Sequence, residues 1–512
     1  MFAALVLFLL LGYPVAFALG AVGLCFGVIG VELGLLHPAL FQALPERIYG
    51  IMANDTLLAV PFFTFMGLIL ERSGMAEDLL DTIGQLFGPV RGGLAYAVVL
   101  VGALLAATTG VVAASVISMG LISLPIMLRY GYDRRLATGV IAASGTLAQI
   151  IPPSLVLIVL ADQLGRSVGD MYQGAILPGL VLTAFYLTYV LGRSTFFPAA
   201  APALPAEART LRGLKLASRV VFVLIPPLAL IFLVLGTIFL GIATPTEGGA
   251  MGATGALILA LLHRRLTWSL LKQAMNSTAK LTSFVIFILV GSTVFSLTFR
   301  GVNGDLWVEH LLTSLPGGVL GFLLVVNALV FVLAFFLDFF ELAFIIVPLL
   351  APVAAKLGID LIWFGVLLGV NMQTSFMHPP FGFALFYLRS VAPAQAYADK
   401  VNGRRIEPVT TGQIYWGAVP FVVIQVIMVG IVIAFPQLVT GMLEKSAADA
   451  SKIELNIQTP DYEREQLERD NAAPDFGAPK GNEPENRPPS PDQSRPGTDA
   501  GGDLEKLFKD SN

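Results

Sequence analysis

Long stretches without charged side chains dominate residues 1–443, and they limit the possible folds of this chain more than any other feature. Apolar residues make up 56% of the 512 residues and charged residues 13%, about half of what soluble domains carry. Most of the runs have the length of a helix that crosses a bilayer. They lie at 56–70, 92–128, 136–161, 174–192, 220–246, 248–262, 281–299, 310–355, 361–388 and 412–443. The chain is therefore predicted to be an all-α integral membrane protein.

Charge is concentrated at the C-terminus. Residues 444–512 contain 16 acidic and 9 basic side chains, many prolines and few large apolar residues, a composition typical of disorder. Residues 1–443 carry a net charge of +3, without the basic clusters that nucleic-acid binding needs. One cysteine, four scattered histidines and no phosphate-binding loop predict that the chain is not an enzyme and has no resident cofactor.

The N-terminal 36 residues carry a single charge, Glu32. They lack a basic segment and a cleavage site with small residues, so a retained anchor is predicted instead of a signal peptide. The stretch is longer than one span, and Gly12-Tyr13-Pro14 is able to interrupt it. One tilted helix and two short helices both fit.

Two runs have lengths that do not suit simple crossings. The run 92–128 has 37 residues and the run 310–355 has 46, too long for one helix and short for two full spans with a loop. Re-entrant hairpins at 92–128 and 316–355 fit both lengths, provided that their turns are buried in protein or line a cavity.

A shift of 227 residues aligns 89–153 with 316–380 without a gap. All four prolines of the first window then fall on prolines of the second: Pro89 on Pro316, Pro125 on Pro352, Pro152 on Pro379 and Pro153 on Pro380. Gly131 also falls on Gly358, and Asp133 on Asp360. The chain is thus predicted to contain two homologous halves.

Basic residues in the loops indicate that the halves are inverted. Arg129, Arg134 and Arg135 follow the first long run, whereas the equivalent second loop has Lys356 together with Asp360. Cytoplasmic loops are enriched in Lys and Arg, so the two loops are expected on opposite sides. The predicted organisation is a first repeat with the N-terminal helices at 1–192, a basic cytoplasmic linker at 193–219, a second repeat at 220–443 and an acidic disordered tail at 444–512.

Each half has a double proline deep in an uncharged run, Pro152-Pro153 in 136–161 and Pro379-Pro380 in 361–388. Proline removes a backbone donor and clashes with the preceding turn, so two broken helices with freed carbonyls are predicted. Small or polar residues precede the breaks, namely Ser144, Gly145, Thr146 and Gln149 in one half and Asn371, Gln373, Thr374 and Ser375 in the other. Such oxygen-rich backbone suits Na⁺, and exposed helix N-termini suit an anionic substrate. Kinked packing helices with Ser/Thr caps are the alternative.

The hairpin tips also carry polar residues. Thr108, Thr109 and Gly110 lie midway along the first long run, and adding 227 to Gly110 gives the neighbour of Asp338. An intramembrane carboxylate costs a few kcal/mol unless it is paired, hydrated or protonated. Asp338 is therefore predicted to coordinate a cation or to cap the tip, and its alternative role is a hydrogen bond to a helix end. For Glu341, a place in the site and a position facing water at the end of the hairpin are equally compatible with the sequence. His378 is expected to be a structural, hydrogen-bonded histidine.

Several motifs carry a family resemblance: Val60-Pro-Phe-Phe-Thr-Phe-Met-Gly, Leu124-Pro-Ile-Met with Tyr130-Gly-Tyr, Ile151-Pro-Pro-Ser, Ala243-Thr-Pro-Thr-Glu-Gly-Gly and Pro379-Pro-Phe-Gly. Over about residues 1–440 the chain resembles the DctM-like large permease subunit of TRAP (tripartite ATP-independent periplasmic) transporters. The resemblance implies a multi-pass Na⁺-driven importer of organic acids in the bacterial inner membrane, with an elevator-like core of the ion-transporter class. It also implies a separate small four-helix subunit (DctQ-like) and a periplasmic binding protein (DctP-like).

The resemblance further implies where ions and substrate bind. The family's hairpin tips and broken helices correspond here to Thr108–Gly110, Asp338 and the segments 145–154 and 371–380, which include Pro152, Pro153, Ser154, Pro379 and Pro380. Na⁺ is expected near Gly110, Gly145, Asp338 and Asn371. The first tip continues with Val111-Val112, where family members often have Ser-Gly-Ser-Ser, so it offers fewer hydroxyl groups.

Two other functions compete with this interpretation. A stand-alone carboxylate carrier coupled to Na⁺ or H⁺ has the same repeats and differs only in having no partners. An intramembrane enzyme needs converging catalytic side chains, and apart from Asp338 and Glu341 the uncharged runs supply no such set.

Overall fold

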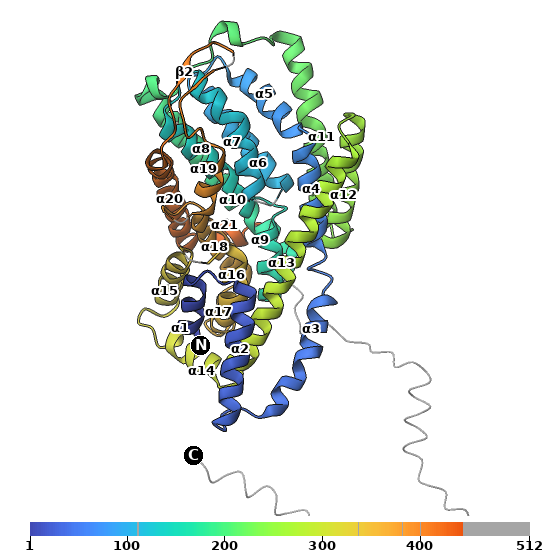
Figure 1. The fold of residues 1–512 in the computed structure, drawn as a ribbon, viewed down its shortest axis with the longest axis vertical. Helices are drawn as coiled ribbons and strands as arrows, with labels where there is room; N and C mark the ends of the chain where they lie inside the picture. Colours follow the sequence, from blue (N-terminus) through green and yellow to red (C-terminus); the bar gives the residue numbers. More distant parts are fainter. Residues whose placement is uncertain (110–111, 336, 381, 400, 444–512) are drawn as a thin grey trace, which may run out of the picture. The chain divides into compact units, whose positions relative to one another are not determined.

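The computed structural model describes residues 1–109, 112–335, 337–380, 382–399 and 401–443, and it does not describe the side chains of Thr108 and Thr109. This part of the chain is helical apart from one two-stranded hairpin (Figure 1). The predicted tail 444–512 and the tip residue Gly110 lie outside the described residues.

The N-terminal half consists mainly of α-helices with short 3₁₀ turns between them. In chain order they are α1 (Phe2–Leu10), α2 (Val15–Glu32), η1 (Pro38–Ala43), α3 (Leu44–Met52), α4 (Ala59–Arg72), α5 (Met75–Phe87), α6 (Gly93–Thr109), α7 (Val112–Arg129), α8 (Arg134–Thr146), η2 (Leu147–Gln149), α9 (Leu155–Leu164), α10 (Val168–Phe196), η3 (Pro198–Ala200) and η4 (Ala206–Ala208).

The C-terminal half is also mainly α-helical and contains the two strands. Its elements are α11 (Gly213–Phe239), α12 (Pro245–Leu262), α13 (Trp268–Gly301), α14 (Gly304–Thr313), α15 (Gly318–Leu333), α16 (Phe339–Glu341), the π-helical turn η5 (Leu342–Ile346), α17 (Val347–Lys356), α18 (Leu361–Gln373), η6 (Thr374–Phe376), α19 (Phe383–Val391), β1 (Tyr397–Ala398), β2 (Arg405–Ile406), α20 (Thr411–Ala434) and α21 (Gln437–Thr440).

Seven helical segments of the described part are long and apolar enough to cross a membrane, in agreement with the predicted class. They are Val15–Glu32, Val112–Arg129, Val168–Phe196, Gly213–Phe239, Trp268–Gly301, Phe339–Lys356 and Thr411–Ala434. At the N-terminus the chain forms two helices and not one, because Gly12 adopts a positive φ of 85° and Pro14 precedes α2. Proline fits this position, since the first turn of a helix has no intrahelical partner for its backbone N–H groups.

The two halves have the same local structure at the predicted offset. Helix α8 and turn η2 correspond residue by residue to α18 and η6 after a shift of 227. Asp133 caps α8 by accepting a hydrogen bond from Leu136 N at 2.9 Å, and Asp360 caps α18 through Trp363 N at 2.8 Å. These capping aspartates explain why the two helices begin at equivalent residues.

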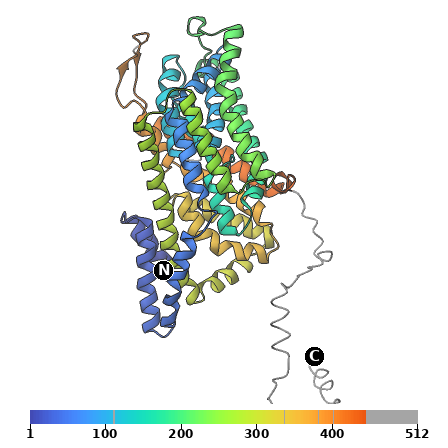
Figure 2. The ribbon, with the colours of Figure 1, turned by 90° about the vertical axis from the view of Figure 1, so that its right-hand side faces the viewer.

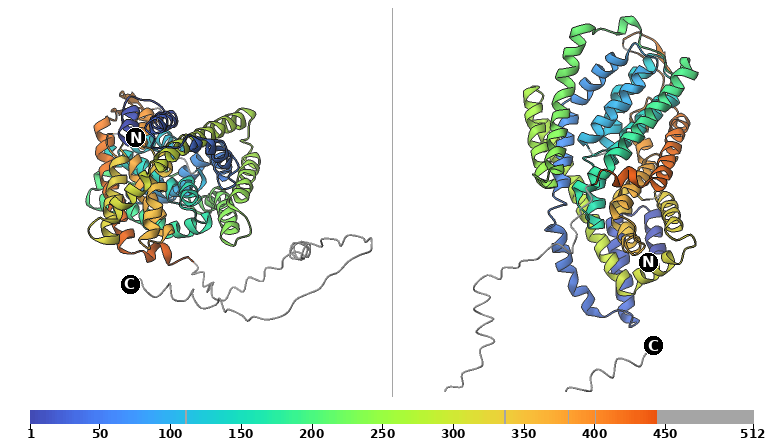
Figure 3. Two further views of the ribbon diagram at one scale, coloured as in Figure 1. Left: turned by 90° about the horizontal axis from the view of Figure 1, so that it is seen from below. Right: turned by 180° about the vertical axis from the view of Figure 1, so that it is seen from behind.

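The two halves pack against each other through matching pairs of helices. Helix α8 packs against α20 as α18 packs against α10, and α7 packs against α19 as α17 packs against α9. Figure 3 shows α20, in orange, beside the teal helices of the first half. At the α8–α20 contact a Cβ on Gly139 would lie 2.1 Å from the Gly417 carbonyl oxygen, so both helices depend on glycine to approach this closely. The pairing is what a two-fold relation between the halves produces.

The long helix α13 connects the outer helices of both halves. It packs against α2 near one end and against α4 near the other, and α4 also packs against α12 (Figure 1). A Cβ on Gly23 of α2 would approach the backbone of Phe295 to 2.8 Å. The outer helices are therefore held together by close backbone packing.

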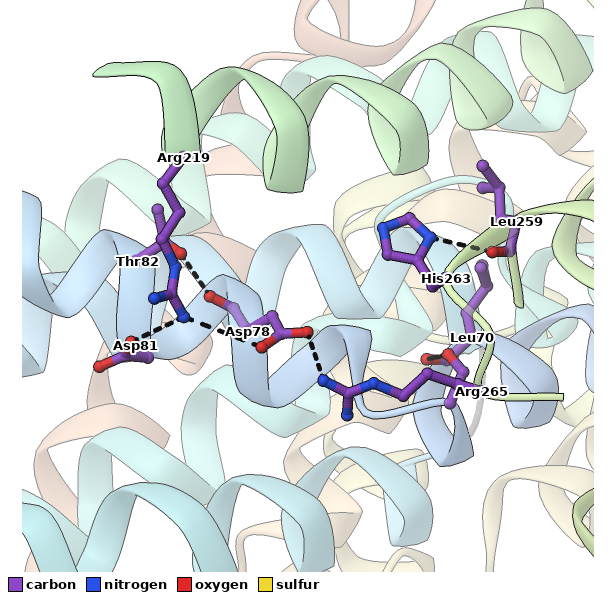
Figure 4. Close-up of polar contacts among 9 residues, drawn as sticks. Leu70, Asp78, Asp81, Thr82, Arg219, Leu259, His263 and Arg265 are labelled. Atoms are coloured by element: carbon purple, nitrogen blue, oxygen red, sulfur yellow. Dashed lines mark hydrogen bonds and ion pairs between the residues drawn. The ribbon is translucent and has the colours of Figure 1, made fainter. Parts of the chain in front are cut away.

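One group of charged residues joins α5 to the second half. Arg219, at the end of the predicted linker, lies in α11 and pairs with Asp81 at 3.0 Å and with Asp78 at 3.9 Å (Figure 4). Arg265, in the turn between α12 and α13, reaches the other oxygen of Asp78 at 3.1 Å. The neighbouring His263 is engaged with the Leu259 carbonyl.

The strands β1 and β2 form an antiparallel hairpin, with Tyr397 opposite Ile406 (Figure 2). The Nε atom of Arg129, at the end of α7, donates to Asp399 Oδ2 at 2.8 Å. Asp399 also accepts hydrogen bonds from the backbone N–H groups of Val401 and Asn402. The hairpin is thus fastened to the first half by one buried carboxylate.

Candidate functional site

Both predicted helix breaks are present. Helix α8 ends at Thr146, η2 follows, and the next regular helix begins only at Leu155. Helix α18 ends at Gln373, and α19 begins at Phe383 after η6. The peptide bonds Pro152-Pro153 and Pro379-Pro380 are both cis. The ends of α8 and α18 are equivalent residues of the two halves, as the sequence predicts.

The two breaks contact each other through equivalent residues. Gln373 Nε2 donates to Thr146 Oγ1 at 3.2 Å, and these residues are 227 positions apart. Equivalent residues of a repeat meet in this way only near the axis that relates the two copies. Gln425 of α20 donates to Tyr186 OH of α10 at 2.9 Å and approaches Thr146 Oγ1 at 3.5 Å. All four side chains are buried.

Buried polar atoms without a hydrogen-bond partner in the described residues surround this contact. They include Ser144 Oγ, both amide atoms of Gln149, Gln373 Oε1 and Gln425 Oε1. Unpaired buried polar groups are costly and rare in folded proteins. Their concentration around two helix breaks is typical of a site that binds a ligand or ion.

Other predicted site residues hold the broken segments in shape. Ser154 Oγ donates to the Gln149 carbonyl at 2.6 Å across the first break. In the second half Thr374 Oγ1 donates to the Asn371 carbonyl at 2.6 Å, and Asn371 Nδ2 reaches the carbonyl of Asn327 in α15 at 2.8 Å. Gly145 packs against α7, where an added Cβ would lie 2.4 Å from Val116.

Asp338 and Glu341 form a reciprocal capping box at the start of α16. Glu341 N donates to Asp338 Oδ1 at 3.0 Å, and Asp338 N donates to Glu341 Oε2 at 2.9 Å. Asp338 therefore caps the tip, one of the two roles predicted for it, at the start of the helix that it begins. Each carboxylate uses one oxygen in this box. Glu341 is 7% exposed, so it belongs to the buried tip and not to a water-facing end.

His378 differs from the expected hydrogen-bonded histidine. The centroid of its ring lies 4.2 Å from the ring centroid of Phe331 and 4.3 Å from that of Phe335. Neither ring nitrogen has a hydrogen-bond partner in the described residues. This side chain is therefore held by aromatic packing and not by the expected hydrogen bonds.

A central cavity of about 420 Å³ is lined by residues of α7, of α16 and of both helix breaks. The first half contributes Val112, Ala113, Gln149, Leu155 and Val156, and the second half contributes Asp338, Glu341 and a group of aromatic residues. Leu281 and Phe284 of α13 complete the lining. The cavity therefore brings Asp338 together with both breaks, whereas Pro152, Pro153, Pro379, Pro380, Asn371 and Thr146 lie outside its lining.

An outer cavity of about 340 Å³ lies further along the same segments. Asp162 and Gln163 of α9 line it, as do Ser292 and Ser296 of α13. Arg47 of α3 and Arg300 at the end of α13 are exposed in this cavity. Within the described residues neither arginine has an ion-pair partner.

Sequence reasoning missed Gln425, Tyr186 and the aromatic lining of the central cavity. Gln425 is the only polar side chain between Gly417 and Ala434 in α20, and such an isolated polar residue is often functional in membrane proteins. Tyr186 gives no such signal, because Thr183, Thr188 and Tyr189 lie close to it in α10. The aromatic residues carry no comparable signal, because phenylalanine is common throughout this chain.

These features define the class of protein: repeated apolar helices, interrupted at a shared cavity, are typical of a membrane transporter. The family model described as "Tripartite ATP-independent periplasmic transporter, DctM component" matches residues 2–438. The chain belongs to this family, and it is an integral multi-pass membrane protein.

Individual relatives agree with this assignment. The chain is 31% identical over 359 residues to the C4-dicarboxylate TRAP transporter large permease protein DctM of Pseudomonas aeruginosa, covering 70% of this chain and 82% of that protein. It is 27% identical to the isethionate TRAP transporter permease protein DctMQ of Oleidesulfovibrio alaskensis, covering 77% of this chain and 60% of that protein. The crystal structure of the Alcanivorax borkumensis YdaH transporter matches with a TM-score of 0.55 at 15% identity, covering 82% of this chain and 99% of that one, which shows a shared fold.

Proposed function

We propose that this chain is the large membrane subunit of a Na⁺-coupled secondary transporter, and that it imports a small organic anion delivered by a periplasmic binding protein. The observation that carries the proposal is the hydrogen bond between Gln373 and Thr146, the equivalent residues at which the two broken helices meet. Alternating-access carriers built from repeats bind substrate and ions at this kind of junction.

Sodium fits the donor set at the two breaks. Gln149 Oε1, Gln373 Oε1 and Ser144 Oγ are buried oxygens without partners in the described part of the chain. Interrupted transmembrane helices supply Na⁺ ligands from backbone carbonyls and side-chain oxygens. We place the ions near Gly145, Asp338 and Asn371, and near Gly110 at the first tip.

The proposed movement is elevator-like. The two hairpins, which we take to be re-entrant, and the broken helices would move as one body past α13. Leu281 and Phe284 of α13 form one wall of the central cavity, while the other lining residues come from the proposed moving parts. A cavity at the boundary between a fixed and a moving part closes and opens when the parts slide.

The outer cavity supports an anionic cargo. Arg47 and Arg300 place two positive charges in the same cavity as Asp162. The Oδ1 atom of Asp162 accepts a hydrogen bond from Asn54 Nδ2 at 2.7 Å. A positive vestibule raises the local concentration of anions and speeds their entry. With Arg129, Arg134 and Arg135 on the cytoplasmic side, this cavity faces the periplasm of a bacterial inner membrane. A DctQ-like four-helix subunit and a DctP-like binding protein complete the proposed assembly.

The test is uptake of a candidate organic acid by proteoliposomes that contain this chain, its small partner and the binding protein. Uptake is expected to require an inward Na⁺ gradient and the binding protein. Unchanged uptake after replacing Na⁺ with K⁺ would contradict the coupling, and full uptake without the binding protein would favour the stand-alone carrier.

A further inference from the structure

We infer that the cargo is an aromatic monocarboxylic acid, with its ring among the phenylalanine side chains of the central cavity and its carboxylate at Gln149. This inference rests on the proposed function, because it takes the central cavity as the cargo site. Two independent features support it, the aromatic lining and the distribution of charge.

Aromatic rings form most of the second half's share of the lining. Phe340 lies 4.2 Å from Phe339 and 6.3 Å from Phe284 between ring centroids, and the Phe284–Phe340 pair is edge-to-face at 85°. Phe376 and Phe383 form a second pair at 5.9 Å. All five rings line the cavity together with Tyr387. Such rings favour edge-to-face or offset contacts with another ring.

Polar cargo has few partners in this cavity. Within the described lining, polar side chains occur only at Gln149, Asp338, Glu341 and Tyr387. A sugar acid would bury several hydroxyl groups against phenylalanine without a hydrogen bond, and each such group costs about 1–3 kcal/mol. The lining therefore selects against polyhydroxylated acids.

The charge distribution limits the cargo to one carboxylate. The described lining includes two carboxylates and no lysine or arginine. Lys280 of α13 is exposed and lies outside the lining, and the Arg389 guanidinium donates to the Val409 carbonyl. Each cargo carboxylate is repelled by Asp338 and Glu341 and needs an added cation to offset this repulsion, so a second carboxylate adds to the cost of binding. A dicarboxylate is thus disfavoured.

Gln149 provides a place for the carboxylate. Its side chain is 1% exposed and lines the cavity, and neither amide atom has a partner in the described residues. An amide N–H group donates well to a carboxylate oxygen. The buried donor and the neighbouring rings together match a carboxylate attached to a flat apolar body.

The test measures binding of benzoate, succinate and gluconate to the purified full-length chain in Na⁺, from the rise in melting temperature with ligand concentration. Benzoate is expected to bind at least about tenfold more tightly than either polar acid. Phe383→Leu keeps an apolar side chain but removes the ring, and Gln149→Leu removes the amide; each is expected to weaken benzoate binding about tenfold. Phe386→Leu is the matched control, because Phe386 lies on the same helix but is 47% exposed and outside the lining.

Equal or tighter binding of succinate or gluconate overturns the inference, and so does unchanged benzoate binding in both Phe383→Leu and Gln149→Leu. The same samples measured in K⁺ separate this result from the proposed function. Stabilisation specific to Na⁺ without any benzoate effect rejects the aromatic cargo and leaves Na⁺ coupling intact. Benzoate binding that is identical in Na⁺ and K⁺ rejects the coupling and leaves the cargo class intact.

Discussion

Asp338 illustrates how one side chain can serve both structure and binding. Its Oδ1 atom caps α16 through Glu341 N, and its carboxylate lines the central cavity. Capping and cation binding are compatible at this residue, because the cap occupies only one of the two carboxylate oxygens.

Substitution by asparagine separates these two roles. Asparagine caps helices about as well as aspartate, so Asp338→Asn is expected to retain the melting temperature while losing Na⁺-driven uptake. Asp338→Ala is expected to lose uptake and also about 0.5–2 kcal/mol of stability. Uptake by Asp338→Asn at the rate of the unmodified chain would show that the charge has no part in transport.

Thr146 is the acceptor at the contact between the two breaks. Thr146→Val preserves the shape of the side chain but leaves the Gln373 amide without its acceptor, at an expected cost of about 1–3 kcal/mol. We expect a lower melting temperature and weaker stabilisation by Na⁺, both measured by thermal unfolding. Thr183→Val is the matched control, because Thr183 is buried and donates to the Gly179 carbonyl within its own helix, α10. Equal Na⁺ stabilisation of both variants would count against a role for the contact.

Some residues of the site were predictable and others were not. Ser144, Thr146 and Gln373 precede double prolines at a repeated spacing, so local sequence marks them. Gln425 joins the same network from a helix 279 residues away from Thr146, and only the packing of α20 against α8 brings it there. Local patterns contain no information about such a contact.

At the scale of elements, a double proline alone is an insufficient signal. Pro226-Pro227 lies inside α11, which continues from Gly213 to Phe239 without a break. The pairs at 152–153 and 379–380 interrupt their helices. The repeat distinguishes these cases, because only the two interrupting pairs occupy equivalent positions. Secondary structure was therefore predictable where two halves of the chain gave the same signal.

The hairpin β1–β2 is expected to depend on pH through Asp399. Burial alone would raise the pKa of Asp399, but the hydrogen bond and charge of Arg129 and two backbone N–H donors outweigh it and hold the pKa below its ordinary value. A lowered pKa means that the charged group stabilises the fold above its unfolded pKa of about 3.9. This stabilisation is lost as the pH falls through the lower folded-state value.

Hydrogen exchange at Val401 and Asn402 measures this effect. Once corrected for intrinsic rates, protection of these amides is expected to fall between pH 6 and pH 2. Asp399→Asn should show reduced protection at pH 6. Protection that is independent of pH and of the substitution would mean that other contacts hold the hairpin.

At the scale of the whole molecule, the two halves contribute to one central cavity. Val112 and Gln149 come from the first half, and Asp338 and Phe383 come from the second. The fold class and the repeat were predictable, since they depend on apolar runs and on prolines at a fixed offset. The aromatic character of the cavity was not, because thirty-five phenylalanines are spread over the chain and only tertiary packing determines which of them face it.

Equilibrium binding of ²²Na⁺ to the purified full-length chain tests most directly whether the meeting point of the two breaks holds a sodium ion. We predict saturable binding that unlabelled Na⁺ displaces and K⁺ does not, with weaker binding in Thr146→Val and Asp338→Asn and unchanged binding in Thr183→Val. Binding that K⁺ displaces equally well, or that both site variants retain in full, would contradict the account.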